Sequence, residues 1–339
     1  MLSRDSQFRA RRGGQCGCRH GSIVESLFDA RRGPMLCVVW IVLLLDAGCL
    51  PLPAAGQASQ PAFACAKPVA VCEITDGRLD EASGLAASRR YPDLYYTHND
   101  SGGKPYVYVL DRNGRIVAEI RLKKAANLDW EDIALAPGAE SGVFEVCAAD
   151  IGDNLARRAG VEIYRFAEPE IKFKANETVV VKITPRIYRA EYADGPRNAE
   201  GFAVDPRTGD GYVFSKREDG RCDVYCMPAP WDEKNVVVMK KIGELRFPPA
   251  PALATMVTGA DLAPDGRALI TRSYVCGWEW RAPTDAKAPE FLRLIEQTPT
   301  RVELAPERQG EGIGYAADGN SVLTISEGSP TTLNEVRFK

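Results

Sequence analysis

A short pattern that could supply oxygen ligands recurs five times along the chain. Each copy begins with a carboxylate or hydroxyl residue, continues with Gly or Asp and an apolar residue, and ends with Ala or Gly. The fullest copy covers residues 127–134, and the equivalent positions of the five copies are Ser83, Glu131, Glu200, Ala260 and Glu311. Successive positions are 48, 69, 60 and 51 residues apart. A fold that gathers them would create a set of oxygen donors without nitrogen or sulfur, which is the ligand type that Ca²⁺ prefers.

The residues after each copy predict the elements that would position these donors. Clusters of Pro, Asp and Gly form a turn, and β-rich runs follow. The second runs are residues 94–97, 144–149, 211–215, 268–272 and 321–325. The third runs are residues 106–110, 161–166, 223–227, 276–280 and 333–337. Fourth runs are residues 116–121, 179–188 and 236–245, with a less clear one at 291–304.

Repeats of four short strands predict an all-β fold, a β-propeller with five four-stranded blades. Six blades are the alternative, if residues 170–198 contain more structure than the pattern indicates. The last repeat has only three strands before Lys339, and the run 70–74 belongs to no repeat. We therefore expect this N-terminal strand to complete the last blade and close the ring, which leaves no free edge.

Propeller geometry predicts where the recurring acids lie. The first strand of every blade lines the central channel, so all five copies would meet at one mouth. Converging carboxylates repel one another unless a cation lies between them or they retain protons. We therefore predict a Ca²⁺ site there, with ligands Ser83, Glu131, Glu200, Glu311 and Asp261. The alternatives are that each acid only begins a strand in a solvated loop, or that the cation only stabilises the ring.

The second strands return to the same mouth and end in polar residues. The candidates for binding an anionic substrate there are Asn99, Asp153, Lys216, Arg217, Arg272 and Tyr274, with Arg157 nearby. Fixed cations beside a divalent metal bind phosphate and stabilise charge that develops on it. His98 is suited to proton transfer near neutral pH, so His98 and Asp100 are the candidate catalytic residues. The chain has no Gly-x-Ser-x-Gly motif, which argues against a serine hydrolase.

The N-terminal region predicts export from the cell. The apolar run 35–45 follows Arg31-Arg32 and is too short to span a bilayer, as in a signal peptide. Residues 35–58 are therefore expected to be a signal, either cleaved after small residues at 54–58 or a lipoprotein signal with a lipid anchor on Cys49. Residues 1–34 are expected to be disordered or to precede the true start, and 65–339 to form the propeller. The protein would be periplasmic, an outer-membrane lipoprotein or secreted.

Composition narrows the classes of partner. The net charge is −3 and no basic stripe with interleaved aromatic residues occurs, so nucleic acid is not expected as a partner. Two histidines in the whole chain exclude a histidine-rich zinc site. Six cysteines follow the predicted signal, and Cys222 and Cys276 occupy matching places in neighbouring repeats, so they are the favoured disulfide pair. We expect a monomer that acts on a small anionic molecule.

Several motifs resemble those of known propeller families. They are residues 83–86, 97–102, 129–134, 150–154 and 163–169, which resemble a group of exported bacterial propeller proteins, some of them described as having an esterase-like phytase domain. The order Ser83, Glu131, Glu200, Ala260, Glu311 is also similar to the Ser, Glu, Glu, Ser, Glu that hold an axial Ca²⁺ in calcium-activated nucleotidases (apyrases). Ala260 departs from that order, so Thr258 or Asp261 would have to substitute for its ligand.

The resemblance and the residues together predict an exported, metal-dependent phosphoester hydrolase that acts at the channel mouth. The alternative is a non-catalytic binding module, on the cell surface or in the periplasm, with a structural axial Ca²⁺. Metal-dependent turnover distinguishes the two.

Overall fold

The computed structural model describes residues 65–283, 288 and 290–339 of the 339-residue chain. All described residues belong to one compact unit. The predicted signal, its cleavage sites and the lipid anchor on Cys49 lie outside the described residues. None of the helices in the described part is long and apolar enough to cross a membrane.

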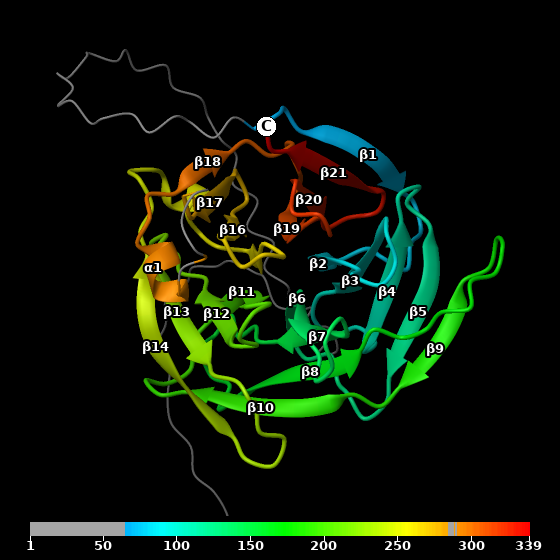
Figure 1. Ribbon diagram of the computed structural model, residues 1–339, viewed down its shortest axis with the longest axis horizontal. Helices are drawn as coiled ribbons and strands as arrows, with labels where there is room; N and C mark the ends of the chain where they lie inside the picture. Colours follow the sequence, from blue (N-terminus) through cyan, green and yellow to red (C-terminus); the bar gives the residue numbers. More distant parts are fainter. Residues whose placement is uncertain (1–64, 284–287, 289) are drawn as a thin grey trace, which may run out of the picture. The chain divides into compact units, whose positions relative to one another are not determined.

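The described part is all-β, with its strands in four sheets (Figure 1). One sheet has the order β2 (Ala82–Ala87), β3 (Leu94–Asn99), β4 (Tyr106–Asp111), β5 (Ile116–Leu122), β9 (Val179–Ile183). A second has the order β11 (Ala199–Val204), β12 (Gly211–Ser215), β13 (Cys222–Met227), β14 (Val237–Leu245), β10 (Arg186–Tyr192), β8 (Val161–Ala167), β7 (Phe144–Asp150), β6 (Trp130–Pro137).

The other two sheets have four strands each. They are β15 (Gly259–Leu262), β16 (Ala268–Arg272), β17 (Gly277–Arg281), β18 (Thr300–Val302), and β1 (Val69–Ile74), β21 (Thr331–Arg337), β20 (Ser321–Ser326), β19 (Gly310–Tyr315). Two short helices, η1 (Ala252–Ala254) and α1 (Phe291–Ile295), lie between strands. The prediction that the N-terminal strand joins the last repeat is confirmed, because β1 pairs antiparallel with β21.

The first strands of the five repeats contact one another in a closed cycle. In this cycle β2 contacts β6, β6 contacts β11, β11 contacts β15, β15 contacts β19, and β19 contacts β2. Figure 1 shows β2, β6, β11 and β19 toward the centre of the domain and β1, β5 and β14 at its periphery. Apart from Pro137 at the end of β6, every residue of these strands is buried, which explains why they lack the polar alternation of an exposed strand.

Small residues let these central strands approach closely. A Cβ atom on Gly314 would overlap the backbone carbonyl of Leu85, which belongs to the neighbouring strand β2. A Cβ on Gly312 would likewise crowd the backbone of Gly84. Gly314, which ends the last copy of the repeated pattern, is thus required by backbone packing.

Buried polar side chains join the central strands to one another. Asp132 in β6 accepts hydrogen bonds from the backbone N–H groups of Phe202 (2.8 Å) and Ala260 (3.0 Å), in β11 and β15. Asp261 in β15 accepts one from Tyr315 in β19 at 2.8 Å. One carboxylate therefore connects three strands, and a second extends the connection to a fourth. Buried acceptors with backbone donors stabilise such an arrangement because every polar group is satisfied.

Five buried apolar clusters lie between successive sets of strands. Leu85 and Leu323, for example, share a cluster that joins β2 to β20, and Ile270 and Ile313 share one that joins β16 to β19. The remaining clusters join β6–β8 to β11–β13, β12 and β13 to β15–β17, and β3–β5 to β6–β8. The hydrophobic core is thus distributed around the domain, between neighbouring strand sets.

The structure differs from the prediction at two of the fourth runs. Residues 179–188 form two strands, β9 and β10, which belong to different sheets and flank Thr184-Pro185. Proline lacks the N–H that a continuous ladder needs, so the strand is interrupted there. β9 pairs parallel with β5, and β10 pairs parallel with β14. Residues 291–304 contain α1 and the short strand β18.

The predicted disulfide is absent. Cys222 and Cys276 are buried in the same apolar cluster, yet both are free thiols. Matching places in neighbouring repeats put the two residues in one core cluster, but they do not put the two sulfur atoms in bonding position.

Candidate metal centre

Three glutamates from distant parts of the chain occupy equivalent positions in the fold. Glu131, Glu200 and Glu311 are each the second residue of a central strand, β6, β11 and β19. Their exposed fractions are only 3%, 4% and 4%. Burial raises the pKa of Glu131 well above its usual value, and the charges of Glu200 and Glu311 raise it further. The structure thus brings these predicted residues to one place.

Three further carboxylates join them from loops at the same ends of the sheets. Asp100 follows β3, Asp129 precedes β6, and Glu327 follows β20. One carboxylate oxygen each from Asp100, Asp129 and Glu131 lie within 4.8 Å of one another. The same holds for one oxygen each from Asp100, Glu311 and Glu327. Six carboxylates, called here the acidic cluster, therefore converge: Asp100, Asp129, Glu131, Glu200, Glu311 and Glu327.

Burial and mutual repulsion shift the ionisation of the acidic cluster. The pKa of Asp100 is raised to about 8 by burial and then by Glu311 and Asp129. The pKa of Glu327 is raised to about 9 by burial and by Glu311. Burial also raises the pKa of Glu200 to about 7, although Lys216 opposes the shift. In the absence of a cation the cluster therefore retains protons near neutral pH.

Among the described residues, Lys216 is the basic side chain that forms an ion pair with the acidic cluster. The Lys216 ammonium group donates hydrogen bonds to Glu200 Oε1 and, at 2.6 Å, to the Tyr274 hydroxyl. Burial disfavours its charge, but Glu200 and Tyr274 outweigh this effect and raise the pKa of Lys216. Burial raises the pKa of Tyr274 to about 12. Lys216 and Tyr274, both predicted to bind substrate, thus lie at the cluster as a pair.

Several oxygens of the acidic cluster lack a partner. Asp100 Oδ1, Glu200 Oε2 and Glu311 Oε2 are buried and accept no hydrogen bond from any described residue. A buried carboxylate oxygen without a donor costs free energy, so such groups are normally satisfied by a hydrogen bond, a proton or a metal ion. The unpaired groups are all carboxylate oxygens, which are the ligands of hard divalent cations.

Gly152 allows the backbone to approach the cluster. A Cβ atom at this position would overlap Glu131 Oε1 and Asp129 Oδ2. The loop that contains Gly152 is held by Arg158, which pairs with Asp150 Oδ1 at 2.6 Å and donates to the Gly152 carbonyl at 2.7 Å. Asp150 in turn accepts backbone hydrogen bonds from Leu128 and Asp129. An ion pair outside the cluster therefore positions one of its ligands.

The structure contradicts the predicted role of His98. The imidazole is fully buried and packs edge-to-face against Trp130, with ring centroids 5.4 Å apart. Burial lowers the pKa of His98 to about 4, so the ring is neutral at physiological pH. Its Nδ1 lies 3.1 Å from the carbonyl oxygen of Asn99. A neutral, enclosed imidazole is poorly suited to exchange protons near pH 7, so we do not retain His98 as a catalytic residue.

Arg272 was also predicted wrongly as a substrate-binding residue. Its side chain is 1% exposed and pairs with Glu307 at 2.8 Å. It also donates to the backbone carbonyls of Gly312 (3.1 Å) and Ile325 (3.3 Å). Arg272 therefore joins β16 to β19 and β20 inside the core, where it cannot reach a ligand.

The other predicted substrate residues have local roles. Arg217 is 37% exposed at the side chain and pairs with Asp219 and Asp223. Asn99 donates to the Arg78 carbonyl and to Asp80. Asp153 accepts a 2.7 Å hydrogen bond from the Arg158 backbone, and Arg157 is exposed to solvent. Among the described residues, no hydrogen bond or ion pair joins these four side chains to the acidic cluster, although the charge of Asp153 contributes to the raised pKa of Asp129.

Two predicted metal ligands act instead between strands. Ser83 Oγ donates to the Glu131 carbonyl at 2.6 Å and so links β2 to β6. Both oxygens of Asp261 accept backbone hydrogen bonds, from Leu262 and Tyr315, and its charge interacts with Arg89. Asp261 therefore lies apart from the acidic cluster. Asp129 and Glu327, which were not among the predicted ligands, lie in the acidic cluster instead.

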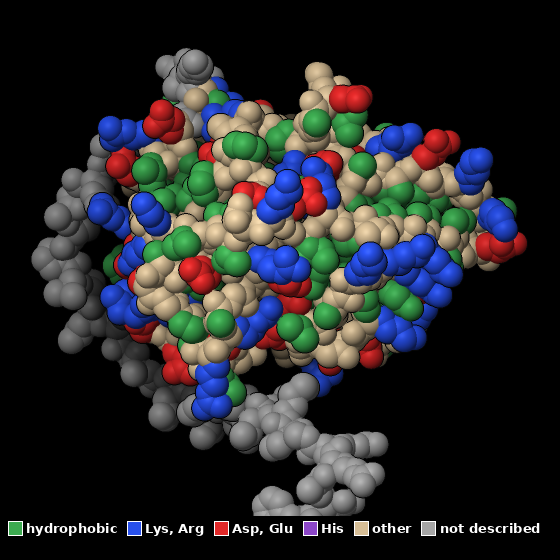
Figure 2. Space-filling model, turned by 90° about the horizontal axis from the view of Figure 1, so that it is seen from below, with side chains coloured by type: hydrophobic (Ala, Val, Ile, Leu, Met, Phe, Trp, Pro, Cys, Tyr) green, Lys and Arg blue, Asp and Glu red, His purple; other side chains and the backbone are tan. Residues whose placement is uncertain are grey.

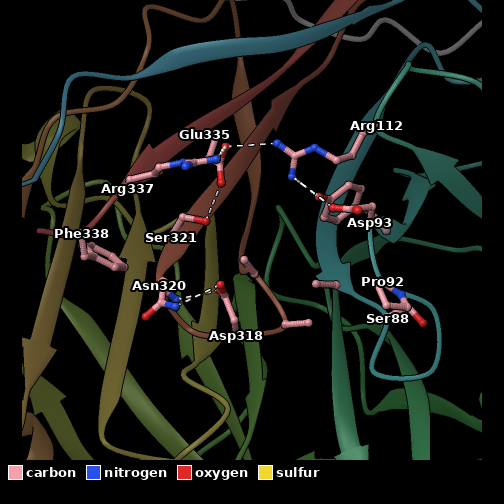
Figure 3. Close-up of a pocket in the computed structure, with 14 residues that line it drawn as sticks. Ser88, Pro92, Asp93, Arg112, Asp318, Asn320, Ser321, Glu335, Arg337 and Phe338 are labelled. Atoms are coloured by element: carbon pink, nitrogen blue, oxygen red, sulfur yellow. Dashed lines mark hydrogen bonds and ion pairs between the residues drawn. The ribbon is translucent and has the colours of Figure 1, made fainter.

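A separate cavity lies away from the acidic cluster. It has a volume of about 560 Å³ and is lined by residues at the opposite end of β2 and β19 from the acidic cluster, among them Ala87 and Ala316 (Figure 3). Its charged groups pair with one another, as Arg112 does with Asp93 at 3.4 Å and with Glu335 at 3.2 Å. On the face shown in Figure 2, too, acidic and basic side chains are interspersed. The buried acidic cluster is unlike either surface.

Comparison with models of known protein families finds no match, and no curated protein matches this sequence. The function is therefore inferred from the chemistry of the acidic cluster.

Proposed function

We propose that the domain is a five-bladed β-propeller. The support is the closed cycle of five central strands, the five apolar clusters between successive strand sets, and the N-terminal strand that completes the last set. On this reading β9 is an additional outer strand, and the pairing of β10 with β14 joins two neighbouring blades. The acidic cluster then lies at one mouth of the central channel.

The proposed ligand of that mouth is Ca²⁺. The observation that carries this proposal is the set of buried carboxylate oxygens without partners, on Asp100, Glu200 and Glu311. The donor set contains only oxygen, which favours a hard cation over zinc or copper. Glu131 and Glu311 would each supply ligand oxygens from a central strand together with Asp100, and the charge of Glu200 would add to the negative potential there. An exported protein meets the high Ca²⁺ concentrations to which extracellular sites respond.

The proposed activity is hydrolysis of a small phosphoester at this mouth. A bound divalent cation would polarise a phosphoryl oxygen and lower the pKa of a coordinated water. The Lys216 ammonium group is positioned to attract the phosphoryl oxygens once the bound cation offsets the charge of Glu200. Tyr274 accepts a hydrogen bond from Lys216, so its own proton is free to be donated to the leaving oxygen. Water supplies the hydroxyl that replaces the alcohol on phosphorus.

A binding module with a structural Ca²⁺ is the second candidate. The observation that favours it is that Lys216, the basic residue in contact with the acidic cluster in the described part, is already paired with Glu200. If no basic side chain at the mouth is free to pair with phosphate, the mouth would bind an uncharged ligand through hydrogen bonds.

The test is turnover by the purified full-length protein on a panel of phosphomonoesters and phosphodiesters. We expect hydrolysis with Ca²⁺, its loss with a chelator, and its loss in Glu200→Gln. Glu177→Gln is the matched control, because Glu177 pairs only with Lys174 on the surface. Calcium-dependent stability without turnover on any ester would support the binding module. No effect of Ca²⁺ on stability or turnover would exclude both candidates.

A further inference from the structure

The acidic cluster contains two groups of three carboxylates, and in each group the oxygens lie close enough together to bind one metal ion. The oxygens of Asp100, Asp129 and Glu131 form one set, and those of Asp100, Glu311 and Glu327 form the other. Asp100 is the member common to both. Asp129 and Glu131 come from one end of β6, whereas Glu311 and Glu327 come from β19 and the loop after β20. The two sets therefore approach Asp100 from different strand sets.

Unpaired oxygens point to ligands in both sets. Glu311 is 4% exposed and its Oε2 has no hydrogen-bond partner among the described residues. Asp100 Oδ1, in the member common to both sets, is likewise buried and unpaired. Glu200 Oε2, also unpaired, completes the ring of acids around them, while Glu200 Oε1 is occupied by Lys216. Each set thus has at least one buried oxygen that accepts no hydrogen bond from the described residues, although Glu327 lies within hydrogen-bond reach of the Glu311 carboxylate.

The charge of the acidic cluster favours more than one cation. Fully ionised, its six carboxylates and the single ammonium group of Lys216 carry a net charge of −5. One divalent cation reduces this to −3, which is still a strong repulsion in a buried site. A second reduces it to −1, close to balance.

We propose that the mouth binds two divalent cations bridged by the Asp100 carboxylate. One is held by Asp129 and Glu131, and the other by Glu311 and Glu327. Bridged pairs of this kind lie about 3.5–4 Å apart and clamp both the attacking and the leaving oxygen of a phosphoester. The inference rests on the proposed function, and it specifies the substrate class as a phosphate group that can contact both cations.

The position of Gly152 is consistent with the first of these sites. Its backbone lies against Glu131 and Asp129 with no space for a side chain, so this loop limits where both carboxylates can lie. No described glycine lies in the same way against the carboxylate of Glu311 or Glu327, whereas Asp129 and Glu327 are both partly buried and so do not distinguish the two sites. The Asp129–Glu131 site is therefore the better organised, and the Glu311–Glu327 site is expected to bind more weakly.

Calcium stoichiometry of the full-length protein tests the proposal. Isothermal titration with Ca²⁺, together with native mass spectrometry, should give two ions per chain. Glu327→Gln should retain one ion, Asp129→Asn should retain one, and Asp100→Asn should lose the tight binding of both. Glu177→Gln, a surface carboxylate, should retain two. Circular dichroism of each variant shows whether a loss of Ca²⁺ binding comes from the altered site or from unfolding. Glu327→Gln is the variant least expected to unfold, because Glu327 is only partly buried.

The outcomes distinguish this inference from the proposed function. One ion in the wild-type protein would overturn the two-cation site and leave a single-calcium enzyme or module standing. No ion would overturn both. Two ions that both survive in Glu327→Gln and in Asp129→Asn would show that the cations bind elsewhere, which also overturns the assignment.

Discussion

The backbone of Gly152 lies directly against the carboxylate of Glu131. Glu131 Oε1 occupies the space that a Cβ atom at position 152 would need, and Asp129 Oδ2 borders the same space. A residue that carries no functional group thus determines where two candidate ligands lie. Backbone contact is a more rigid support than a flexible side chain, because it cannot move without moving the loop.

Gly152→Ala should therefore weaken Ca²⁺ binding while the sheets remain folded. The added methyl group displaces Glu131 and Asp129, so we expect affinity to fall roughly tenfold or more, which corresponds to about 1.4 kcal/mol. Calcium titration measures the effect. Gly77→Ala is the control, because no atom lies within 4 Å of the position of its Cβ. Unchanged affinity in Gly152→Ala would contradict the role assigned to this contact.

Arg272→Met should destabilise the fold without touching the metal site. The substitution leaves Glu307 as a buried, unpaired charge, and removing one partner of a buried pair costs roughly 3–5 kcal/mol. Arg293→Met removes an exposed pair with Glu296 and should cost less than about 1 kcal/mol. Denaturant unfolding in the presence of Ca²⁺ gives both values. Equal losses would mean that Arg272 does not connect the strands as described.

Stability of the metal-free protein should fall as pH rises from about 6 to 9. The pKa values of Glu200, Asp100 and Glu327 are raised to about 7, 8 and 9 in the fold, far above those of the unfolded chain. The folded state thus binds more protons than the unfolded state in this range, and their stabilising contribution is lost as each group ionises.

The measurement is the thermal midpoint at several pH values with chelator and with Ca²⁺. Chelated protein should lose stability with rising pH, whereas Ca²⁺ should reverse the trend, because cation and protons compete for the same oxygens. Glu327→Gln should reduce the slope. A slope that Ca²⁺ does not change would place the titrating groups outside the metal centre.

Lys216→Met should increase the stabilisation that Ca²⁺ provides. Lys216 neutralises Glu200 in the metal-free protein, so its removal leaves one more uncompensated negative charge at the mouth. Metal-free protein should unfold at lower temperature, and Ca²⁺ should bind more tightly. Tyr274→Phe keeps the ammonium group and removes only the hydroxyl, so its Ca²⁺ affinity should match wild type. Weaker Ca²⁺ binding in Lys216→Met would show that the lysine organises the site instead of competing with the cation.

The sequence predicted strands best where local signals mark both ends. β12 and β16 have the bounds expected from the sequence, because turn residues precede each and a change to polar residues follows. The sequence-based prediction was wrong where the pairing partner of a strand determines the sheet to which it belongs. Val179–Ile183 and Arg186–Tyr192 look alike as β-rich sequence, yet one pairs with β5 and the other with β8 and β14.

The sequence predicted those residues of the site that occupy equivalent positions in the repeats. Glu131, Glu200 and Glu311 share a position in their strands, so equivalence alone identified them. Asp129 and Glu327 lie in flanking loops, and the repeat carries no signal for them beyond their closeness to its ends. The type of a residue does not show whether its side chain is buried. The sequence therefore predicted Arg272 and His98 at the mouth, although both are buried in the core.

The pairing of β1 with β21 has a consequence for engineering the chain. These strands lie side by side although one begins at Val69 and the other ends at Arg337. A short linker between them would leave the order of strands in every sheet intact, so new termini could be opened elsewhere. The solvent-exposed residues 172–177, far along the chain from the acidic residues, are a suitable place. Circular permutants cut there should keep the same set of carboxylates together, since what gathers them is the ring and not the starting point of the polypeptide.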